Sequence, residues 1–305
     1  MTAATVLDVD RPAPRPRRSF WRYWRGNLKG SEFTWALAFS VPYIAVFLAF
    51  VAYPVSYGLW MGSDPALYSD VFSDVIYQDT VVNTLIFVAL GVNLKLFLAL
   101  LLSGVFMRPG WLTKVMLMLF VLPWAVPQLP AFISLHWMLN GEWGLLNNAL
   151  WILGGIEGPS WLNERWTALG CAIASHLWKW TPFWTVILLA GRMSIPQDIY
   201  DAAKVDGATG LNRFLFVTFP LLANLYLVLT LLATIFLLGD FNTVFFVTGG
   251  GPNNETHLLA TLGIRNAFDL ARPDLGVAVV MTALPVLIPL VIILMRKLKT
   301  AEVQL

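Results

Sequence analysis

The 305-residue chain is 58% hydrophobic and only 12% charged, and it contains 14 tryptophans and 20 phenylalanines. This composition excludes an ordinary soluble domain, in which about 25% of residues are charged, so an integral membrane protein is expected. The net charge of +2 carries little weight, because in such a chain the distribution of charge matters more than its sum. The one cysteine, Cys171, lies in an apolar run and is expected to be a buried, inert thiol.

The chain begins with a basic tail, residues 1–32, and continues into an apolar run that is too long for a cleaved signal peptide. A helix needs about 20 mostly apolar residues to cross a bilayer, and six runs meet this length. The predicted spans are 34–60, 81–106, 112–139, 166–190, 217–247 and 274–295. The predicted division is a tail (1–32), one six-span domain (33–299) with a polar loop at 192–220, and a short C-terminus (300–305).

The distribution of lysine and arginine predicts the orientation, because cytoplasmic loops retain these residues. Counted over alternate connections, one set carries 15 of them, including those of the tail, and the other set carries 3. Both termini and the polar loop are therefore expected to face the cytoplasm. The basic tail could in addition bind anionic membrane lipid.

The polar loop contains the stretch IYDAAKVDGATG, residues 199–210. Ser194 and Gln197 fit a capping box, Pro196 suits a first helical turn, and Gly207 suits a left-handed C-terminal stop. These signals predict a short helix of about three turns. Its alanines leave positions nearly bare, so that another backbone can approach closely.

The spacing in this loop resembles the cytoplasmic EAA loop of permease subunits of binding-protein-dependent ABC importers. The matching residues are Asp201, Ala202, Ala203, Asp206, Gly207, Ala208, Phe214 and Pro220. In that family the loop is a coupling helix that sits in a groove of the ATPase subunit, and the resemblance implies this role here. Asp201 departs from the pattern, because the family usually has a glutamate at this position.

Other stretches are similar to the sugar-importing branch, the family of the maltose and glycerol-phosphate permeases. They are LPWAVP (122–127), GLLNNAL (144–150), WKWTPFWTVILLAGRMSIP (178–196) and DFNTVFFVTGGGPNNET (240–256). The resemblance implies an all-α membrane protein with the six-transmembrane-helix type I ABC importer permease fold. It also implies three kinds of partner, namely a second permease subunit of the same fold, two ATP-binding subunits and an extracytoplasmic sugar-binding protein. The implied location is the bacterial cytoplasmic (inner) membrane, and no nucleic-acid partner is expected.

Charged groups at membrane depth usually face a cavity or a partner. Of those in the predicted spans, Lys95 is expected to meet a neighbouring chain or a subunit interface. In the maltose-permease relatives the spans on either side of the EAA loop contact the substrate. By resemblance, the substrate path is lined here by His176, Lys179, Trp180, Phe183, Ala233, Phe236, Leu237 and Asp240.

The residue types in this set suit a sugar, whose CH faces stack on aromatic rings and whose hydroxyls need donors and acceptors. Trp180 and Phe183 could form the platform, while Asp240 and His176 bind hydroxyl groups. Two alternatives stay open, namely that the rings face lipid or core, and that Lys179 and Asp240 form a structural ion pair.

No G-x-x-x-x-G-K-[ST] phosphate cradle occurs in the sequence. We therefore expect a non-catalytic subunit without a cofactor of its own, with ATP and Mg²⁺ bound by partner ATPase subunits. The predicted function is a permease that forms the path of a disaccharide or small oligosaccharide. Within the same family the alternative is glycerol phosphate, a polyol or another solute. A secondary transporter, which usually shows repeated halves, and a membrane-embedded enzyme using His176 and Asp240 are remote alternatives.

Overall fold

The computed structural model describes residues 31–302, with side chains over 32–297, and its regular elements are all helices. The predicted N-terminal tail therefore lies outside the described residues except at its last two positions, and residues 303–305 of the predicted C-terminus also lie outside them. The helices are α2 Ser31–Phe47, η1 Leu48–Ala52, α3 Tyr53–Met61, α4 Pro65–Ser73, α5 Val75–Phe106, α6 Trp111–Ala125, α7 Gln128–Met138, α8 Leu145–Gly154, α9 Arg165–Met193, α10 Gln197–Val205, α11 Gly210–Arg213, η2 Phe214–Thr218, α12 Phe219–Leu238, α13 Asn242–Val247, α14 Leu259–Ile264, η3 Arg265–Asp269, α15 Pro273–Met281 and α16 Leu284–Glu302.

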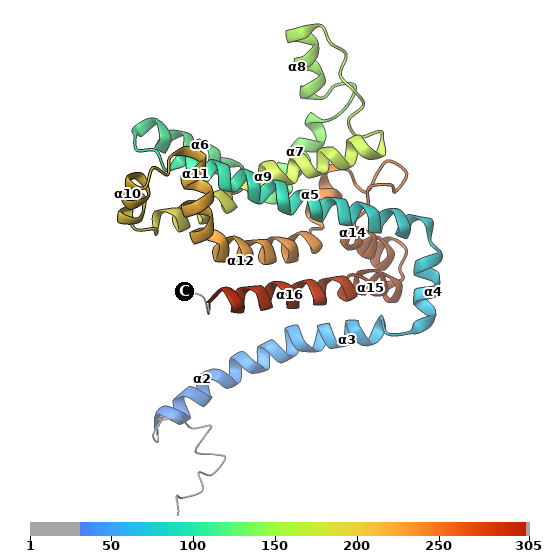
Figure 1. The fold of residues 1–305 in the computed structure, drawn as a ribbon. Coiled ribbons are helices and arrows are strands. Elements are labelled where there is room, and N and C mark those ends of the chain that lie inside the picture. The colour runs from blue at the N-terminus through green and yellow to red at the C-terminus, as the bar shows by residue number, and fades with distance from the viewer. Residues whose placement is uncertain (1–30, 303–305) are drawn as a thin grey trace, which may run out of the picture. The chain divides into compact units, whose positions relative to one another are not determined.

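The prediction of an all-α membrane protein is confirmed. The chain forms two units, one ending at Tyr57 and one beginning at Gly58, and each is described by itself. The first unit is the N-terminal helix. The second unit contains the helices from α4 onwards, and the sites described below lie within it (Figure 1).

The described residues contain four continuous helices that are long and apolar enough to cross a membrane, at Glu32–Met61, Val75–Phe106, Gly210–Leu238 and Pro273–Lys297. A bent pair formed by α6 and α7 makes a fifth if it is counted as one span. The fourth predicted span, 166–190, is the continuous helix α9, but it is less apolar because it carries buried polar groups. Length and apolar composition alone thus support four or five spans, where the sequence predicted six.

The third predicted span, 112–139, is not one straight helix. It breaks between α6 and α7 with a bend of 94°. Pro127 and Pro130 have no N–H, so the carbonyl groups four residues before them, on Pro123 and Val126, have no helical donor. The prolines therefore account for the bend.

The fifth predicted span, 217–247, is also interrupted. It consists of α12 and α13, and residues 240–241 between them are not helical. The interruption follows Gly239, and it frees the backbone and side chain of Asp240 to turn into the protein. Non-helical backbone at membrane depth is tolerated where it is buried in protein or lines a cavity.

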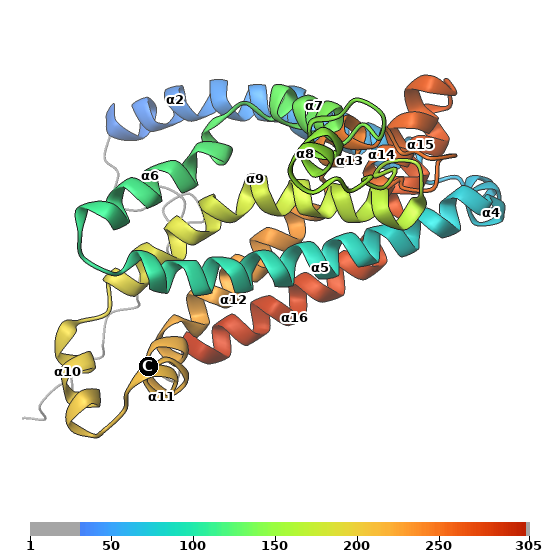
Figure 2. The ribbon, with the colours of Figure 1, turned by 90° about the horizontal axis from the view of Figure 1, so that it is seen from above.

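The core of the second unit lies between α5, α9 and α12, which run side by side in both views (Figures 1 and 2). Phe87, Leu96, Leu188 and Leu237 are buried there. Gly91 lets α12 approach α5 closely, because a methyl group at this position would lie 2.5 Å from Leu237 Cδ2. Three closely packed helices thus form a frame for side chains that point between them.

Figure 2 shows that α10 and α11 lie at one end of this frame and α4, α14 and α15 at the other. The end with α4, α14 and α15 also carries the turn Gly249–Pro252, in which Gly250 has φ +81°. Gly250 also packs directly against the ring of His257, so a side chain at this position would be both strained and blocked. Arg165 Nη1 holds Asp79 Oδ1 at 2.6 Å at the same end.

The buried side chain of His257, at the same end, is expected to make the stability of the protein depend on pH. It lies in the connection between α13 and α14, where burial and the charge of Arg265 lower its pKa to about 4, against a smaller opposing effect of Asp269. The folded state therefore favours the neutral ring. Stability is expected to be constant above pH 6.5, the ordinary pKa, and to fall as the pH drops from 6.5 towards 4, because the unfolded chain takes up a proton first.

The measurement is the unfolding temperature against pH for the wild type and for His257→Gln. Carboxylates that titrate in the same range contribute equally to both proteins, so the difference between the two curves isolates His257. A difference that does not change between pH 7 and pH 5 would contradict the prediction.

Candidate substrate site and coupling helix

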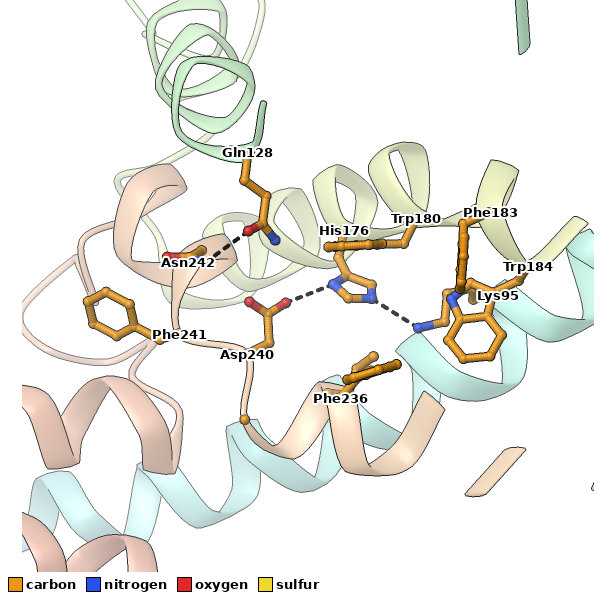
Figure 3. Close-up of a pocket in the computed structure, with 12 residues that line it drawn as sticks. Lys95, Gln128, His176, Trp180, Phe183, Trp184, Phe236, Asp240, Phe241 and Asn242 are labelled. Carbon is orange, nitrogen blue, oxygen red and sulfur yellow. Dashed lines mark hydrogen bonds and ion pairs between the residues drawn. The ribbon is translucent and has the colours of Figure 1, made fainter. Parts of the chain in front are cut away.

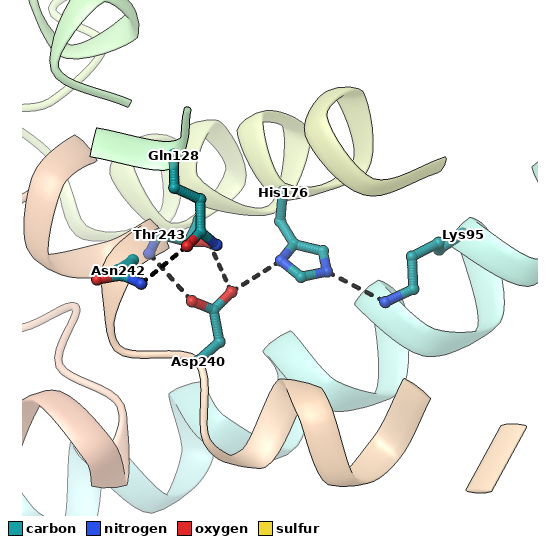
Figure 4. A network of polar contacts seen from close by, with 6 residues as sticks. All are labelled: Lys95, Gln128, His176, Asp240, Asn242 and Thr243. Atoms are coloured by element: carbon teal, nitrogen blue, oxygen red, sulfur yellow. Dashed lines mark hydrogen bonds and ion pairs between the residues drawn. The ribbon is translucent and has the colours of Figure 1, made fainter. Parts of the chain in front are cut away.

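Three buried polar side chains form a chain of contacts across the frame (Figure 4). Lys95 Nζ on α5 lies 3.2 Å from His176 Nε2 on α9, and His176 Nδ1 lies 2.8 Å from Asp240 Oδ2 after α12. Asp240 also accepts hydrogen bonds from the hydroxyl group of Thr243 at 2.6 Å and from its N–H at 3.1 Å. Lys95, His176 and Asp240 are 1%, 3% and 9% exposed, so the chain is internal.

The contacts define a consistent pattern of protons. An ammonium group on Lys95 can only donate, so His176 Nε2 must accept, and His176 Nδ1–H then donates to the Asp240 carboxylate. A neutral imidazole thus connects a buried cation to a buried anion. The three groups together carry no net charge, which makes their burial tolerable.

A cavity of about 280 Å³ opens beside this chain (Figure 3). Its apolar wall consists of aromatic rings from α9 and α12, and its polar wall comes from the two helix breaks. The lining residues are Lys95, Gln128, His176, Trp180, Phe183, Trp184, Phe236, Leu237, Gly239, Asp240, Phe241 and Asn242. The cavity therefore presents flat rings opposite hydrogen-bonding groups.

The polar wall joins the two interrupted spans. Asn242 Nδ2, at the start of α13, donates to Gln128 Oε1, at the start of α7, over 3.0 Å. Phe183 stacks on Trp124 of α6, with ring centroids 5.5 Å apart. Each break thus contributes an amide side chain to the cavity, Gln128 at the first and Asn242 at the second, and is in contact with a neighbouring helix.

The structure brings most of the sequence-predicted substrate-path residues together. His176, Trp180, Phe183, Phe236, Leu237 and Asp240 line the cavity. Ala233 is fully buried in the core and is not among the lining residues. Whether the lining residues contact substrate stays a prediction.

Lys179 lies elsewhere. Its ammonium group donates to the carbonyl groups of Pro123 at 2.8 Å and Trp124 at 3.3 Å, and also to that of Val126. These carbonyls end α6 at the proline break, so Lys179 supplies donors that the prolines remove. The alternative of a Lys179–Asp240 ion pair is wrong, because Asp240 pairs with His176.

Lys95 requires a correction. The prediction that it meets a neighbouring chain or a subunit interface is wrong, because it points inward to His176 and lies 5.1 Å from the ring centroid of Trp184. Trp184 and Gln128 were missed as lining residues. Trp184 follows His176 and Trp180 at four-residue spacing, so helical periodicity could have identified it.

The predicted short helix in the polar loop is α10, and its C-terminal stop is confirmed. Gly207 has φ +77°, its N–H bonds to Lys204 O at 3.1 Å, and the N–H of Ala208 bonds to Ala203 O at 2.8 Å. This pair of bonds is the Schellman motif, in which glycine takes the left-handed position. Ala203 is buried, which explains the need for a small residue there.

The N-terminal part of that prediction is wrong. Ser194 Oγ donates to Gly191 O at 2.7 Å, so it ends α9 and does not cap α10, which begins at Gln197 after Pro196. The acidic residue Asp201 stays exposed on α10. Among the residues that the structure describes, its polar contacts lie within α10, with Gln197 Nε2 at 3.3 Å and Lys204 Nζ at 3.8 Å.

With these sites described, comparisons with known proteins identify the class. Residues 95–299 match the family described as "Binding-protein-dependent transport system inner membrane component". A trehalose/maltose permease, MalF, of Thermococcus litoralis is 36% identical over 66% of this chain and 66% of its own length. A sulfoquinovosyl glycerol permease, SmoG, of Agrobacterium fabrum is 34% identical over 71% of each chain.

The chain therefore belongs to the family of inner membrane components of binding-protein-dependent transport systems. It is a multi-pass membrane permease subunit of an ABC importer. The fold agrees with that of a bacterial alginate ABC transporter, crystallised in complex with an alginate pentasaccharide-bound periplasmic protein. The TM-score is 0.79 at 22% identity, over 90% of this chain and 96% of that chain.

Proposed function

We propose that this permease carries a carbohydrate, a disaccharide or small oligosaccharide, through the cavity beside Asp240. The observation that carries the proposal is the pairing of aromatic rings with a buried carboxylate and two amides in one cavity. Trp180 and Phe183 offer faces for the CH groups of a sugar, and Asp240, Gln128 and Asn242 offer acceptors and donors for its hydroxyls. The sugars in the names of the relatives support the same substrate class.

A second permease subunit of the same fold completes the path in this proposal. The cavity volume of about 280 Å³ lies just below the range of about 300–1,000 Å³ that is usual for ligand pockets. α6 has no buried residue, although it carries large apolar side chains such as Trp111 and Met118. These features fit a half-site that a neighbouring helical subunit or lipid covers.

Energy enters through α10 in this proposal. The helix would sit on one of two cytoplasmic ATPase subunits, which hold ATP and Mg²⁺, while this chain hydrolyses nothing. The end of the bundle with α10 carries Arg192, Lys204 and Arg213, and the opposite connections carry few bases, which supports a cytoplasmic position for α10 in the inner membrane. An extracytoplasmic binding protein would deliver sugar to the opposite end.

The test is reconstitution of the complete importer in proteoliposomes with a panel of mono- and disaccharides. Uptake is expected for a neutral saccharide, and it must stop when an ATPase subunit loses its catalytic activity. Sugar flux driven by an ion gradient alone would overturn the proposal. Uptake restricted to a non-carbohydrate solute would overturn the substrate class but leave the ATP-driven importer intact.

A phosphorylated substrate such as glycerol phosphate is less well supported by the cavity. Lys179, the cation that would suit a phosphate, binds the carbonyl groups at the end of α6. The remaining cation, Lys95, is held by His176, and Asp240 would repel an anion. A polyol satisfies the same contacts as a sugar and is one of the compounds to include in the panel.

Asp201 provides a prediction for coupling. Asp201→Ala is expected to leave ATP hydrolysis by the assembled importer in place while sugar uptake falls at least about tenfold, as for the loss of a charge-assisted hydrogen bond. Asp201→Glu is expected to keep uptake, because it retains the carboxylate. Asp198→Ala is the matched control, since Asp198 is also an exposed acid of α10. Equal uptake by Asp201→Ala and Asp198→Ala would contradict a coupling role for Asp201.

A further inference from the structure

A second hollow, of about 230 Å³, lies where α5 and α9 end beside α10 and α11. Unlike the aromatic cavity, it is lined mainly by polar side chains and carries two cations. Its lining includes Gly104, Arg192, Gln197, Tyr200, Arg213 and Thr218. No carboxylate is among its lining residues, so the hollow is a concentrated positive site.

The guanidinium group of Arg192 is held in place, but not all of its N–H groups have a hydrogen-bond acceptor. Its Nη2 donates to Leu100 O at 2.9 Å, and its guanidinium carbon lies 5.4 Å from the ring centroid of Phe214. Its Nε is buried and has no hydrogen-bond partner in the described part of the chain. Gly104 lies against the guanidinium group, since a methyl group at this position would be in van der Waals contact with Nη1 at 3.4 Å.

Arg213 supplies the second charge. Its guanidinium carbon lies 5.8 Å from the ring centroid of Tyr200, so the two side chains meet in the hollow. Neither arginine forms an ion pair with any described acid; the nearby acid on α10, Asp201, is paired with Lys204 on the exposed side. Two cations that share a hollow without an anion repel each other, and a bound anion relieves this repulsion.

We propose that this hollow binds a phosphate group, supplied either by the headgroup of an anionic phospholipid or by soluble phosphate. Arginine forks bind phosphate oxygens through paired N–H donors, and the Tyr200 hydroxyl and Gln197 amide are further donors at the same wall. The hollow lies at the ends of α5 and α9, where basic pockets between membrane helices meet lipid headgroups. The site is independent of the sugar cavity, so it stands whether or not the substrate is a carbohydrate.

Occupancy of this site has a structural consequence. Arg192 belongs to α9 and Arg213 to α11, and α10 lies between them in the chain. A phosphate group held by both would tie the two ends of the coupling segment together. Phosphate binding is therefore expected to change the mobility of α10 as well as the occupancy of the hollow.

The experiment uses the purified full-length chain, stripped of lipid and titrated with three probes, each followed by native mass spectrometry. The probes are phosphatidylglycerol, phosphatidylcholine and inorganic phosphate. Hydrogen exchange over residues 197–208 is measured with the same samples. The variants are Arg213→Gln and Arg192→Gln. If Arg192→Gln does not fold, Arg192→Lys takes its place, because it keeps the charge and removes the forked guanidinium group. Arg108→Gln is the matched control, because Arg108 is an exposed arginine at the same end of α5 and does not line the hollow.

Retention of phosphatidylglycerol that falls about tenfold in Arg213→Gln but not in Arg108→Gln supports a lipid headgroup, since one charge-assisted hydrogen bond is lost. The same pattern with inorganic phosphate, and no preference among lipids, supports the soluble source. Equal binding by Arg213→Gln and Arg108→Gln would overturn the proposal. So would a structure of the assembled importer in which an acidic side chain of another subunit fills the hollow.

Discussion

Replacing Asp240 with asparagine is expected to lower the stability of the protein by about 3 kcal/mol or more, because it leaves a buried cation without its counter-charge. The amide oxygen can still accept from His176 and from the Thr243 hydroxyl, but the NH2 group then faces the Thr243 N–H, so the change removes the charge and one hydrogen bond. Sugar uptake should fall as well, with a higher apparent KM, if the carboxylate binds substrate hydroxyls. Thermal unfolding in detergent and transport by the reconstituted importer are the two measurements.

The double variant Lys95→Met/Asp240→Asn separates the two effects. Removing both charges should restore much of the stability, because no buried ion is left unpaired. Transport should stay impaired, since the acceptor for the sugar is still altered. Asn242→Ala is the stability control, because it removes only the neutral bond to Gln128 in the same cavity. An unfolding temperature of Asp240→Asn equal to that of Asn242→Ala would contradict the assigned charge pair.

The fold was predictable from sequence wherever a single physical signal dominated. Hydrophobic runs located the long helices α5, α12 and α16, and Gly207 located the end of α10, because only glycine takes that left-handed conformation without strain. Counting apolar residues failed at the interruptions. The break at 126–127 has a signal in the sequence, because Pro127 and Pro130 remove helical donors, but the 94° size of the bend does not follow from it. The break at 240–241 depends on which groups find partners elsewhere in the fold, and sequence spacing does not contain this information.

The site was predictable in position but not in pairing. A histidine and two nearby rings on one face of α9 could be found from periodicity, and Asp240 stood out as a charge in an apolar run. The partner of each charge could not be found. Lys95 reaches His176 across 81 positions of sequence, and Lys179 reaches the end of α6 across more than 50. Such contacts depend on how α5, α6 and α9 pack. The sequence around Lys95 and Lys179 is similarly apolar, so it does not reveal that the two side chains bind different partners.

Replacing Lys179 with methionine is expected to loosen the bend between α6 and α7. The carbonyls of Pro123 and Val126 would normally accept from residues 127 and 130, but both of these are prolines. Lys179 supplies the missing donors, and an apolar side chain of similar length would leave these carbonyls unpaired in an apolar environment. Each unpaired group costs about 1–3 kcal/mol, so a clear loss of stability is expected.

A double-mutant cycle with Pro127→Ala tests this cause. Alanine restores an N–H at position 127, which can bond to Pro123 O, so the Lys179→Met change should cost less in that background than in the wild type. Spin labels at the exposed positions Leu119 and Ser134, in a Cys171→Ser background, report the angle of the bend directly. Lys179→Met should broaden their distance distribution, and the double variant should shift it towards a straighter helix. Additive stability losses with an unchanged distribution would mean that Lys179 only fills space beside α6, and that the prolines hold the bend without it.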